Sequence, residues 1–216
     1  MSRISEKEQL IIYGRLLYEN RFIAGAGGNL SLRLPDNDIL ITPSGMRKGF
    51  MEEDDLVTVG LDGTKISGPR KPSSEMLMHL FVYQSRPEIF ACCHAHPPFA
   101  TAFSIIGRQL PTDLLPEVVL AVGDIPLTEY APPGTKAVPE AIRPFIAGNQ
   151  AFLLRNHGVL TIGRTMEEAY NRMETVEHYA QILYISEKAG SPNFLDPEEM
   201  RRLAKIRDSF GQDNNK

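Results

Sequence analysis

Two histidines separated by one residue, His94 and His96, give this sequence its first chemical signal. On an extended segment, side chains at positions i and i+2 point to the same face, so the two imidazoles can converge on one ion. Residues 89–93 are apolar and predict a buried strand, and the prolines at 97–98 end it directly after the pair. Both histidines are therefore expected at a strand end. Alone, they fit either a metal site or two polar side chains on a half-exposed strand.

A third histidine and a carboxylate can complete such a site. His157 follows the apolar run 151–154, so a histidine again stands where a predicted buried strand ends. Glu75 stands in the first turn of a predicted helix, where it could also serve only to stabilise the helix start. Three imidazoles and one carboxylate suit zinc, with manganese or cobalt as substitutes. The two remaining histidines, His79 and His178, lie inside predicted helices and are interpreted as structural groups or as groups behind the ligands.

Three segments carry backbone amides and hydroxyls of the kind that bind a phosphate. The glycine-rich loop 25–29 lets the main chain approach a ligand, and residues 42–45 add hydroxyls and a further glycine. Residues 71–74 end at a helix N-terminus, where unpaired amides favour an anion. Each segment alone could be only a turn or a helix cap. Because the third runs directly into Glu75, an anion site would adjoin the metal, which fits a phosphorylated carbonyl substrate.

Composition narrows the class of protein. The chain has 216 residues, 42% of them hydrophobic, and a net charge of −4, which predicts one domain over residues 1–216 and favours neither nucleic acid nor a membrane as partner. Its only cysteines, Cys92 and Cys93, are adjacent and are interpreted as small buried hydrophobes in a reducing compartment. We find no apolar run of membrane-spanning length and no signal-peptide pattern near the N-terminus. These features predict a cytoplasmic protein.

Helices and strands alternate along the chain, which predicts an α/β fold. The first helix begins with a capping box at Ser5 and ends near Asn20. The predicted strands are 30–34, 39–41, 56–59, 89–94, 118–122, 151–154 and 159–162, with a hairpin turn at 62–63. The further predicted helices are 73–85, 97–106, 139–146, 165–188 and one from about 197.

Taken together, these segments resemble the class II aldolase/adducin family, and especially its fuculose-phosphate aldolase-like enzymes. The matching stretches occur in the family's order: they are residues 25–31, 41–45, 71–75, 94–96 and 156–158. The resemblance implies a three-layer α/β/α sandwich with a mainly antiparallel central sheet. It also implies a homotetramer with active sites near the subunit interfaces.

The resemblance assigns roles to individual residues. The positions that match the family's zinc ligands are Glu75, His94, His96 and His157. The positions that match its phosphate contacts are Asn29, Ser44, Gly45, Ser73 and Ser74. The metal-site glutamate, here Glu75, is implied to act as acid/base as well. A divalent ion would stabilise the negative charge left when a carbon–carbon bond beside a ketone is cleaved.

Two positions depart from the fuculose-phosphate aldolase pattern. Those enzymes use a tyrosine from a neighbouring subunit as an acid, whereas the comparable stretch here, 114–119, has none. Near the C-terminus, Phe210 stands where a second tyrosine is expected. We hypothesise that Glu117 takes over as acid/base, as a nearby glutamate does in the related methylthioribulose-phosphate dehydratases. The alternative is that Glu117 is only a surface carboxylate.

The leading interpretation is an aldolase that cleaves a ketose 1-phosphate to dihydroxyacetone phosphate and an aldehyde. The first alternative is a dehydratase acting on a methylthioribulose 1-phosphate-like substrate, which Glu117 favours. A pentulose-phosphate 4-epimerase and a decarboxylating relative also stay open. A non-catalytic adducin-like module is least favoured, because such relatives generally lose the metal histidines that this chain keeps.

Overall fold

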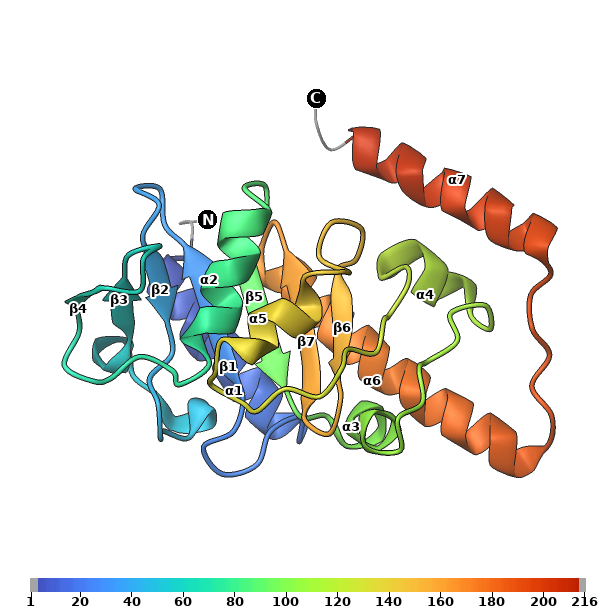
Figure 1. The fold of residues 1–216 in the computed structure, drawn as a ribbon, viewed down its shortest axis with the longest axis horizontal. Coiled ribbons are helices and arrows are strands. Elements are labelled where there is room, and N and C mark those ends of the chain that lie inside the picture. Colours follow the sequence, from blue (N-terminus) through green and yellow to red (C-terminus); the bar gives the residue numbers. More distant parts are fainter. Residues whose placement is uncertain (1–3, 214–216) are drawn as a thin grey trace.

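A seven-stranded sheet forms the centre of the molecule (Figure 1). The computed structural model describes residues 4–213. The strands are β1 (Asn29–Arg33), β2 (Ile39–Ile41), β3 (Val57–Val59), β4 (Lys65–Ser67), β5 (Ala91–Ala95), β6 (Ala151–Leu154) and β7 (Gly158–Gly163). Their order across the sheet is β4-β3-β2-β1-β5-β7-β6, and every neighbouring pair is antiparallel.

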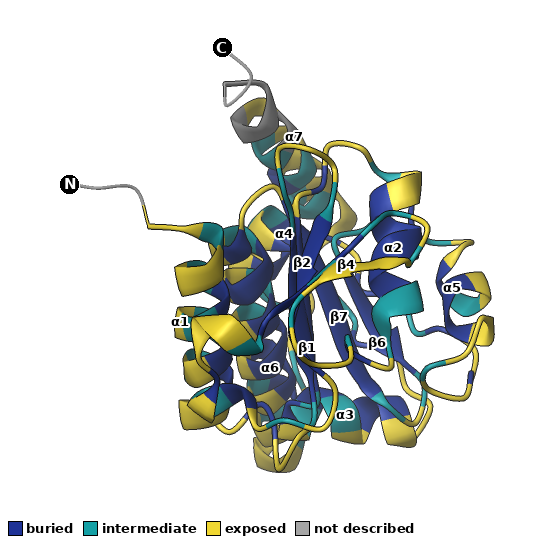
Figure 2. Cartoon of the chain, turned by 90° about the vertical axis from the view of Figure 1, so that its left-hand side faces the viewer, coloured by how far each residue is buried: buried dark blue, intermediate teal, exposed yellow. Residues whose placement is uncertain are grey.

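Helices cover both faces of this sheet. The α-helices are α1 (Glu6–Glu19), α2 (Met76–Ser85), α3 (Pro98–Ile105), α4 (Pro116–Ala121), α5 (Ala137–Ile142), α6 (Met166–Ala189) and α7 (Pro197–Asp213). Two short 3-10 helices span Lys48–Phe50 and Glu53–Asp55. Figure 2 shows α1 and α6 on one side of the sheet and α2 and α5 on the other. The α/β/α sandwich with an antiparallel sheet is therefore confirmed.

Strand β5 is buried along its whole length at the middle of the sheet. Its alternating side chains enter two different cores: Ala91, Cys93 and Ala95 pack with α1, α3 and α6, and Cys92 packs with α2 and α5. Both cysteines are free and buried, as predicted. Burial raises the pKa of the Cys92 thiol to about 12, so this thiol stays protonated. The strand that carries His94 is thus fixed by packing on both faces.

The predicted strand at 118–122 is wrong, because these residues belong to α4 and its end. A short apolar run does not by itself distinguish a buried strand from a buried helix. Pro116 occupies the first turn of α4, where proline is tolerated, and Val118 and Val119 turn inward while α4 packs against α6 and α7.

Other predicted elements are found with small shifts. The helix predicted at 139–146 runs from Ala137 to Ile142, because Pro144 has no backbone N–H to continue the helical hydrogen bonds. The predicted hairpin at 62–63 joins β3 to β4. Among residues 4–213, no helix combines the length and apolarity that crossing a bilayer requires.

Candidate metal centre

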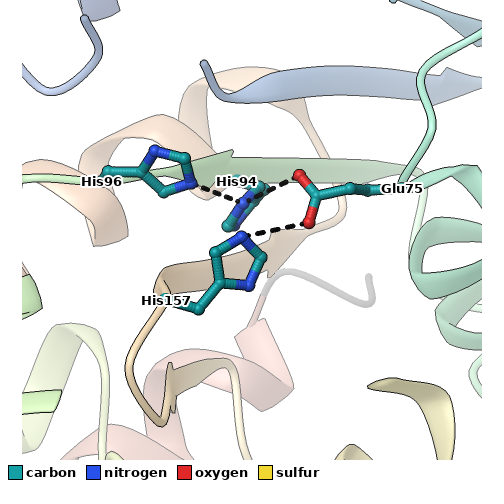
Figure 3. Close-up of side chains that lie close together, drawn as sticks. All are labelled: Glu75, His94, His96 and His157. Atoms are coloured by element: carbon teal, nitrogen blue, oxygen red, sulfur yellow. Dashed lines mark hydrogen bonds and ion pairs between the residues drawn. The ribbon is translucent and has the colours of Figure 1, made fainter. Parts of the chain in front are cut away.

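Four side chains from separate parts of the sequence meet at one end of the central strands (Figure 3). His94 stands near the end of β5 and His96 directly after it. His157 lies in the turn between β6 and β7, and because β7 pairs with β5 antiparallel, the start of β7 lies beside the end of β5. Glu75 precedes the first residue of α2. The sheet thus brings together all four residues named as metal ligands from the sequence.

The distances within this cluster suit a metal ion. The Nε2 atom of His94 lies 3.1 Å from Glu75 Oε2 and 3.1 Å from His96 Nε2, and His157 Nε2 lies 3.1 Å from Glu75 Oε1. All four ligand atoms lie within 4.8 Å of one another. Ligands at about 2.0–2.1 Å from a tetrahedral zinc ion are roughly 3.3 Å apart, close to these separations. Glu75 Oε1 is buried, and in the described chain its 3.1 Å contact with His157 Nε2 lacks hydrogen-bond geometry, so a bound cation would satisfy this oxygen.

Electrostatics and hydrogen bonds set the protonation states of Glu75 and His96 and the orientation of His94. Burial raises the pKa of Glu75, but the positive charge of His94 and the contacts with both histidines outweigh it and hold this pKa well below its ordinary value. Burial and the charges of His94 and His157 lower the pKa of His96 to about 3, so its imidazole is neutral. His94 Nδ1 donates to the carbonyl oxygen of Val159 at 2.8 Å, which leaves Nε2 to face the cluster.

A buried chain of hydrogen bonds stands behind Glu75. Asn29 Nδ2 donates to Glu75 Oε2 at 2.8 Å, and Asn29 Oδ1 accepts a hydrogen bond from His79 Nε2. His79 Nδ1 lies 2.7 Å from the hydroxyl of Ser31, which in turn contacts Tyr83. Burial and the nearby charge of His94 lower the pKa of His79 to about 3. A neutral His79 with its proton on Nε2 therefore fixes the amide of Asn29 with its nitrogen toward Glu75.

The two histidines outside the ligand set take different places. His79 is fully buried and lies behind the ligands, one of the two places expected for it, whereas His178 is exposed on α6. Asn29, named from the sequence as a phosphate contact, bonds directly to Glu75. Because an amide nitrogen carries two N–H groups, that bond leaves the second for an anion.

The three predicted anion-binding segments lie next to one another. Pro43 and Pro72 form an isolated antiparallel β-bridge. Two backbone hydrogen bonds flank it, from the amide of Ser44 to the carbonyl of Lys71 and from the amide of Ser73 to the carbonyl of Thr42. Residues 42–45 and 71–74 are therefore neighbours. Ser44, Gly45 and Ser74 are exposed, whereas Ser73 is buried and its hydroxyl accepts a hydrogen bond from the Glu75 amide at 3.2 Å.

The glycine-rich loop lies directly against the histidine pair. Gly28 has φ +69°, and a Cβ at this position would lie 2.9 Å from the carbonyl oxygen of His94. A Cβ on Gly27 would lie 3.2 Å from Nδ1 of His96. Only a chain without side chains here can approach the histidines so closely. The loop, itself one of the predicted anion-binding segments, therefore lies directly beside the candidate metal cluster.

One residue near these loops was not identified from the sequence. Lys48 is only 2% exposed, and its ammonium donates to the carbonyl oxygens of Ala26 at 3.0 Å and Met46 at 2.6 Å. Burial lowers its pKa to about 8, although the negative charge of Glu75 acts in the opposite direction. In the sequence it stands between Arg47 and Gly49, where no local pattern indicates that a lysine is buried.

The structure does not bring Glu117 into the cluster of its own chain. Glu117 is exposed on α4, which lies with α7 beyond the β6 edge of the sheet, whereas the ligands lie at the end of β5 (Figure 1). The side chain of Phe210 lies outside the described part of the chain.

Comparison with known proteins identifies the family to which this fold belongs. The chain belongs to the family described as "Class II Aldolase and Adducin N-terminal domain", which matches residues 8–184. It is 33% identical over 208 residues to a 5-deoxy-D-ribulose 1-phosphate aldolase of Bacillus thuringiensis, covering 96% of this chain and 97% of that protein. It is 36% identical over 185 residues to a 3-oxo-tetronate 4-phosphate decarboxylase of Escherichia coli, covering 84% and 87%.

A solved structure gives the same result in three dimensions. An L-fuculose 1-phosphate aldolase superposes with a TM-score of 0.87 at 35% sequence identity, covering 95% of this chain and 97% of that one. These relatives are aldolases and a decarboxylase of phosphorylated, sugar-like compounds by name.

Proposed function

We propose that this chain is a metal-dependent class II aldolase that cleaves a ketose 1-phosphate to dihydroxyacetone phosphate and an aldehyde. The observation that carries the proposal is the place of Glu75. Its carboxylate belongs to the ligand cluster, and its backbone amide bonds to Ser73 in a predicted phosphate-binding segment. The names of relatives at 33% and 35% identity, aldolases of deoxyribulose and fuculose 1-phosphates, support this substrate class.

In this proposal Glu75, His94, His96 and His157 hold Zn²⁺, with Mn²⁺ or Co²⁺ as substitutes. The bound ion supplies Lewis-acid stabilisation of the negative charge that develops on the substrate oxygens. The neutral imidazole of His96 and the ionised carboxylate of Glu75 are in the protonation states that metal binding needs. His94 differs from His96 in its protonation. Burial lowers the pKa of His94, but the charge of Glu75 outweighs this effect and raises it, so the proton on Nε2 must leave when a metal binds.

The chain's own residues then orient the substrate and transfer protons. The phosphate is held by the donors of the three neighbouring segments; the proposed contacts are Asn29, Ser44, Gly45, Ser73 and Ser74. This contact fixes the reacting carbons in front of the cluster. In the cleavage direction a base takes the proton of the hydroxyl on the aldehyde-forming carbon, and the adjacent carbon–carbon bond breaks. The bond electrons stay on the carbon of the phosphate-bearing half. We propose that the carboxylate of Glu75 takes up the proton removed from the hydroxyl and delivers it to this carbon, so that no proton is gained or lost overall.

The group that takes the hydroxyl proton is proposed to be Glu117 of a neighbouring copy. Within one chain, α4 carries this exposed side chain away from the cluster, so the role requires an assembly such as a homotetramer with sites at its interfaces. Glu117→Gln keeps size and polarity but removes the base. Full turnover in this variant would remove Glu117 from the mechanism.

A second candidate is the decarboxylation of a phosphorylated 3-oxo acid. It is favoured by the Escherichia coli relative, which at 36% identity is named a decarboxylase. Such a reaction also leaves negative charge beside a carbonyl group, so the same ligands and phosphate contacts would serve. Dehydration of a methylthioribulose 1-phosphate-like substrate and 4-epimerisation of a pentulose phosphate are further alternatives, and the intact ligand set disfavours a non-catalytic module.

Product analysis on zinc-loaded protein separates these reactions. The panel contains fuculose, rhamnulose, 5-deoxyribulose and methylthioribulose 1-phosphates together with 3-oxo-tetronate 4-phosphate. Release of an aldehyde together with dihydroxyacetone phosphate identifies the aldolase. Release of carbon dioxide identifies the decarboxylase, whose other product from 3-oxo-tetronate 4-phosphate is also dihydroxyacetone phosphate. Loss of water identifies the dehydratase. No metal binding and no turnover would contradict the proposal. Two buried free thiols suit a reducing compartment, and we propose the cytoplasm as the location.

A further inference from the structure

A buried ammonium group without an ion pair lies beside the proposed phosphate site. Lys48 is 2% exposed, and among the residues that the structure describes its side chain forms no ion pair. Its two hydrogen-bond acceptors are backbone carbonyl oxygens, those of Ala26 and Met46. Lysine is almost never fully buried unless its charge is paired. The fold therefore bears the cost of a buried charge that its own residues do not neutralise.

The rest of the side chain is closely packed, so the position of the ammonium is well defined. Lys48 belongs to the short 3-10 helix that packs under α1. A Cβ on Gly14 of α1 would lie 2.9 Å from the Lys48 carbonyl oxygen and 3.5 Å from its Cβ. Glycine at this position of α1 permits that close approach. An apolar side chain would fill the same space without the cost of desolvating a charge.

The two carbonyl groups that Lys48 contacts belong to two different anion-binding segments. Ala26 lies in the glycine-rich loop that covers the histidine pair, and Met46 follows Ser44 and Gly45 directly. One ammonium therefore ties these two loops together. An ammonium has three N–H donors, and the two carbonyl groups use two of them.

The charge of Lys48 also lies on the side of the metal centre. One of the carbonyl oxygens that it contacts belongs to Ala26, and a Cβ on the next residue, Gly27, would lie 3.2 Å from Nδ1 of His96. The other cations of these segments, Arg47 and Lys71, are exposed. A buried charge exerts a stronger field on a bound anion than an exposed one, because less water screens it.

We propose that Lys48 is a positioning and specificity residue that selects a phosphorylated substrate. It fixes the two loops in the conformation that receives the phosphate, and it supplies the buried positive charge that the dianion pairs with. This inference rests on the proposed function, because it takes the substrate to carry a phosphate at these loops. A sugar without a phosphate would leave the charge of Lys48 unpaired and is discriminated against for that reason.

Two substitutions separate the charge from the tie between the loops. Lys48→Gln removes the charge and keeps an amide that can donate to carbonyl oxygens, whereas Lys48→Met removes both. Lys65→Met, at an exposed lysine on β4 away from these loops, is the matched control. Zinc content is measured first. Because neither Lys48 nor Lys65 is a proposed metal ligand, all three variants should bind one zinc per chain, as we expect for the unchanged protein.

The affinity for inorganic phosphate is then measured on the zinc-loaded proteins by calorimetry, together with kcat and KM for the active ketose phosphate. We expect Lys48→Gln to weaken phosphate binding by about 10- to 100-fold and to raise KM more than it lowers kcat. Lys65→Met should leave both unchanged. Equal phosphate affinity in Lys48→Gln and the unchanged protein would overturn the inference.

Failure of the proposed function looks different. In that case the unchanged protein itself would neither bind phosphate nor turn over any phosphorylated ketose. If both Lys48 variants fail to fold, lysine side-chain NMR on the unchanged protein provides the test. Phosphate must then shift the Lys48 ammonium resonance, and a resonance that does not move would also overturn the inference.

Discussion

The buried charge of Lys48 predicts an unusual dependence of stability on pH. Its pKa falls from the ordinary 10.5 to about 8 in the folded protein. Between these values the unfolded chain holds a proton that the folded chain has lost, so raising the pH favours the folded state. Lys48→Met has no such group. The free energy of unfolding of the unchanged protein should therefore rise relative to that of Lys48→Met as the pH increases.

The size of this effect follows from the two pKa values. Linkage gives a relative gain of about 2 kcal/mol between pH 7 and pH 9.5. Other groups titrate in this range, but they are common to both proteins and cancel in the difference. The side chain is almost fully buried, so solvent screening reduces the effect little.

The assay is urea unfolding of zinc-free protein at pH 7, 8 and 9.5, followed by circular dichroism at one fixed protein concentration, since assembly would shift the apparent stability. Lys65→Met, at an exposed lysine, should show no divergence from the unchanged protein. Stability curves of Lys48→Met and the unchanged protein that stay parallel with pH would refute the reasoning. So would a divergence of the opposite sign.

Three further predictions concern the residues around the metal centre. His94→Ala should lose bound zinc, measured by atomic absorption after dialysis, and retention of one zinc per chain would contradict the assigned ligand set. His79→Leu removes the hydrogen bond that holds the Asn29 amide and should lower zinc affinity or kcat by about 10- to 100-fold. Competition with a chelator measures the affinity and turnover measures kcat; unchanged values of both would show that His79 only fills space. Gly28→Ala should destabilise the protein by about 1–3 kcal/mol in urea unfolding, because φ is +69° and the new Cβ would lie 2.5 Å from Ile23 Cγ2; a stability within about 0.5 kcal/mol would contradict the required conformation.

The sequence predicts much of this fold because its signals are local. The capping box at Ser5 starts α1, and the apolar runs before His94 and His157 form β5 and β6. The run at 118–122 fails as a strand because local hydrophobicity does not reveal whether a segment pairs with a sheet or packs on α6 and α7. The order of the strands is likewise a property of the whole chain.

For the site, sequence reasoning is strongest where side-chain chemistry is distinctive. His94 and His96 share a face by their spacing, but their meeting with His157 depends on the antiparallel pairing of β5 and β7. Lys48 and the contact of His79 with Asn29 could not be predicted, since each depends on segments that are distant in the sequence. Glu117 remains a proposal because its role requires a second copy of the chain.

The most direct test of this account is a zinc titration of chelator-stripped protein with continuous measurement of dihydroxyacetone phosphate release from a ketose 1-phosphate. The account predicts no release without metal, a linear rise with added zinc, and a plateau at one zinc per chain. His94→Ala should stay inactive throughout the titration. Full release from stripped protein in the presence of chelator, or zinc binding at one per chain without any product from the ketose phosphates, would contradict the central claim.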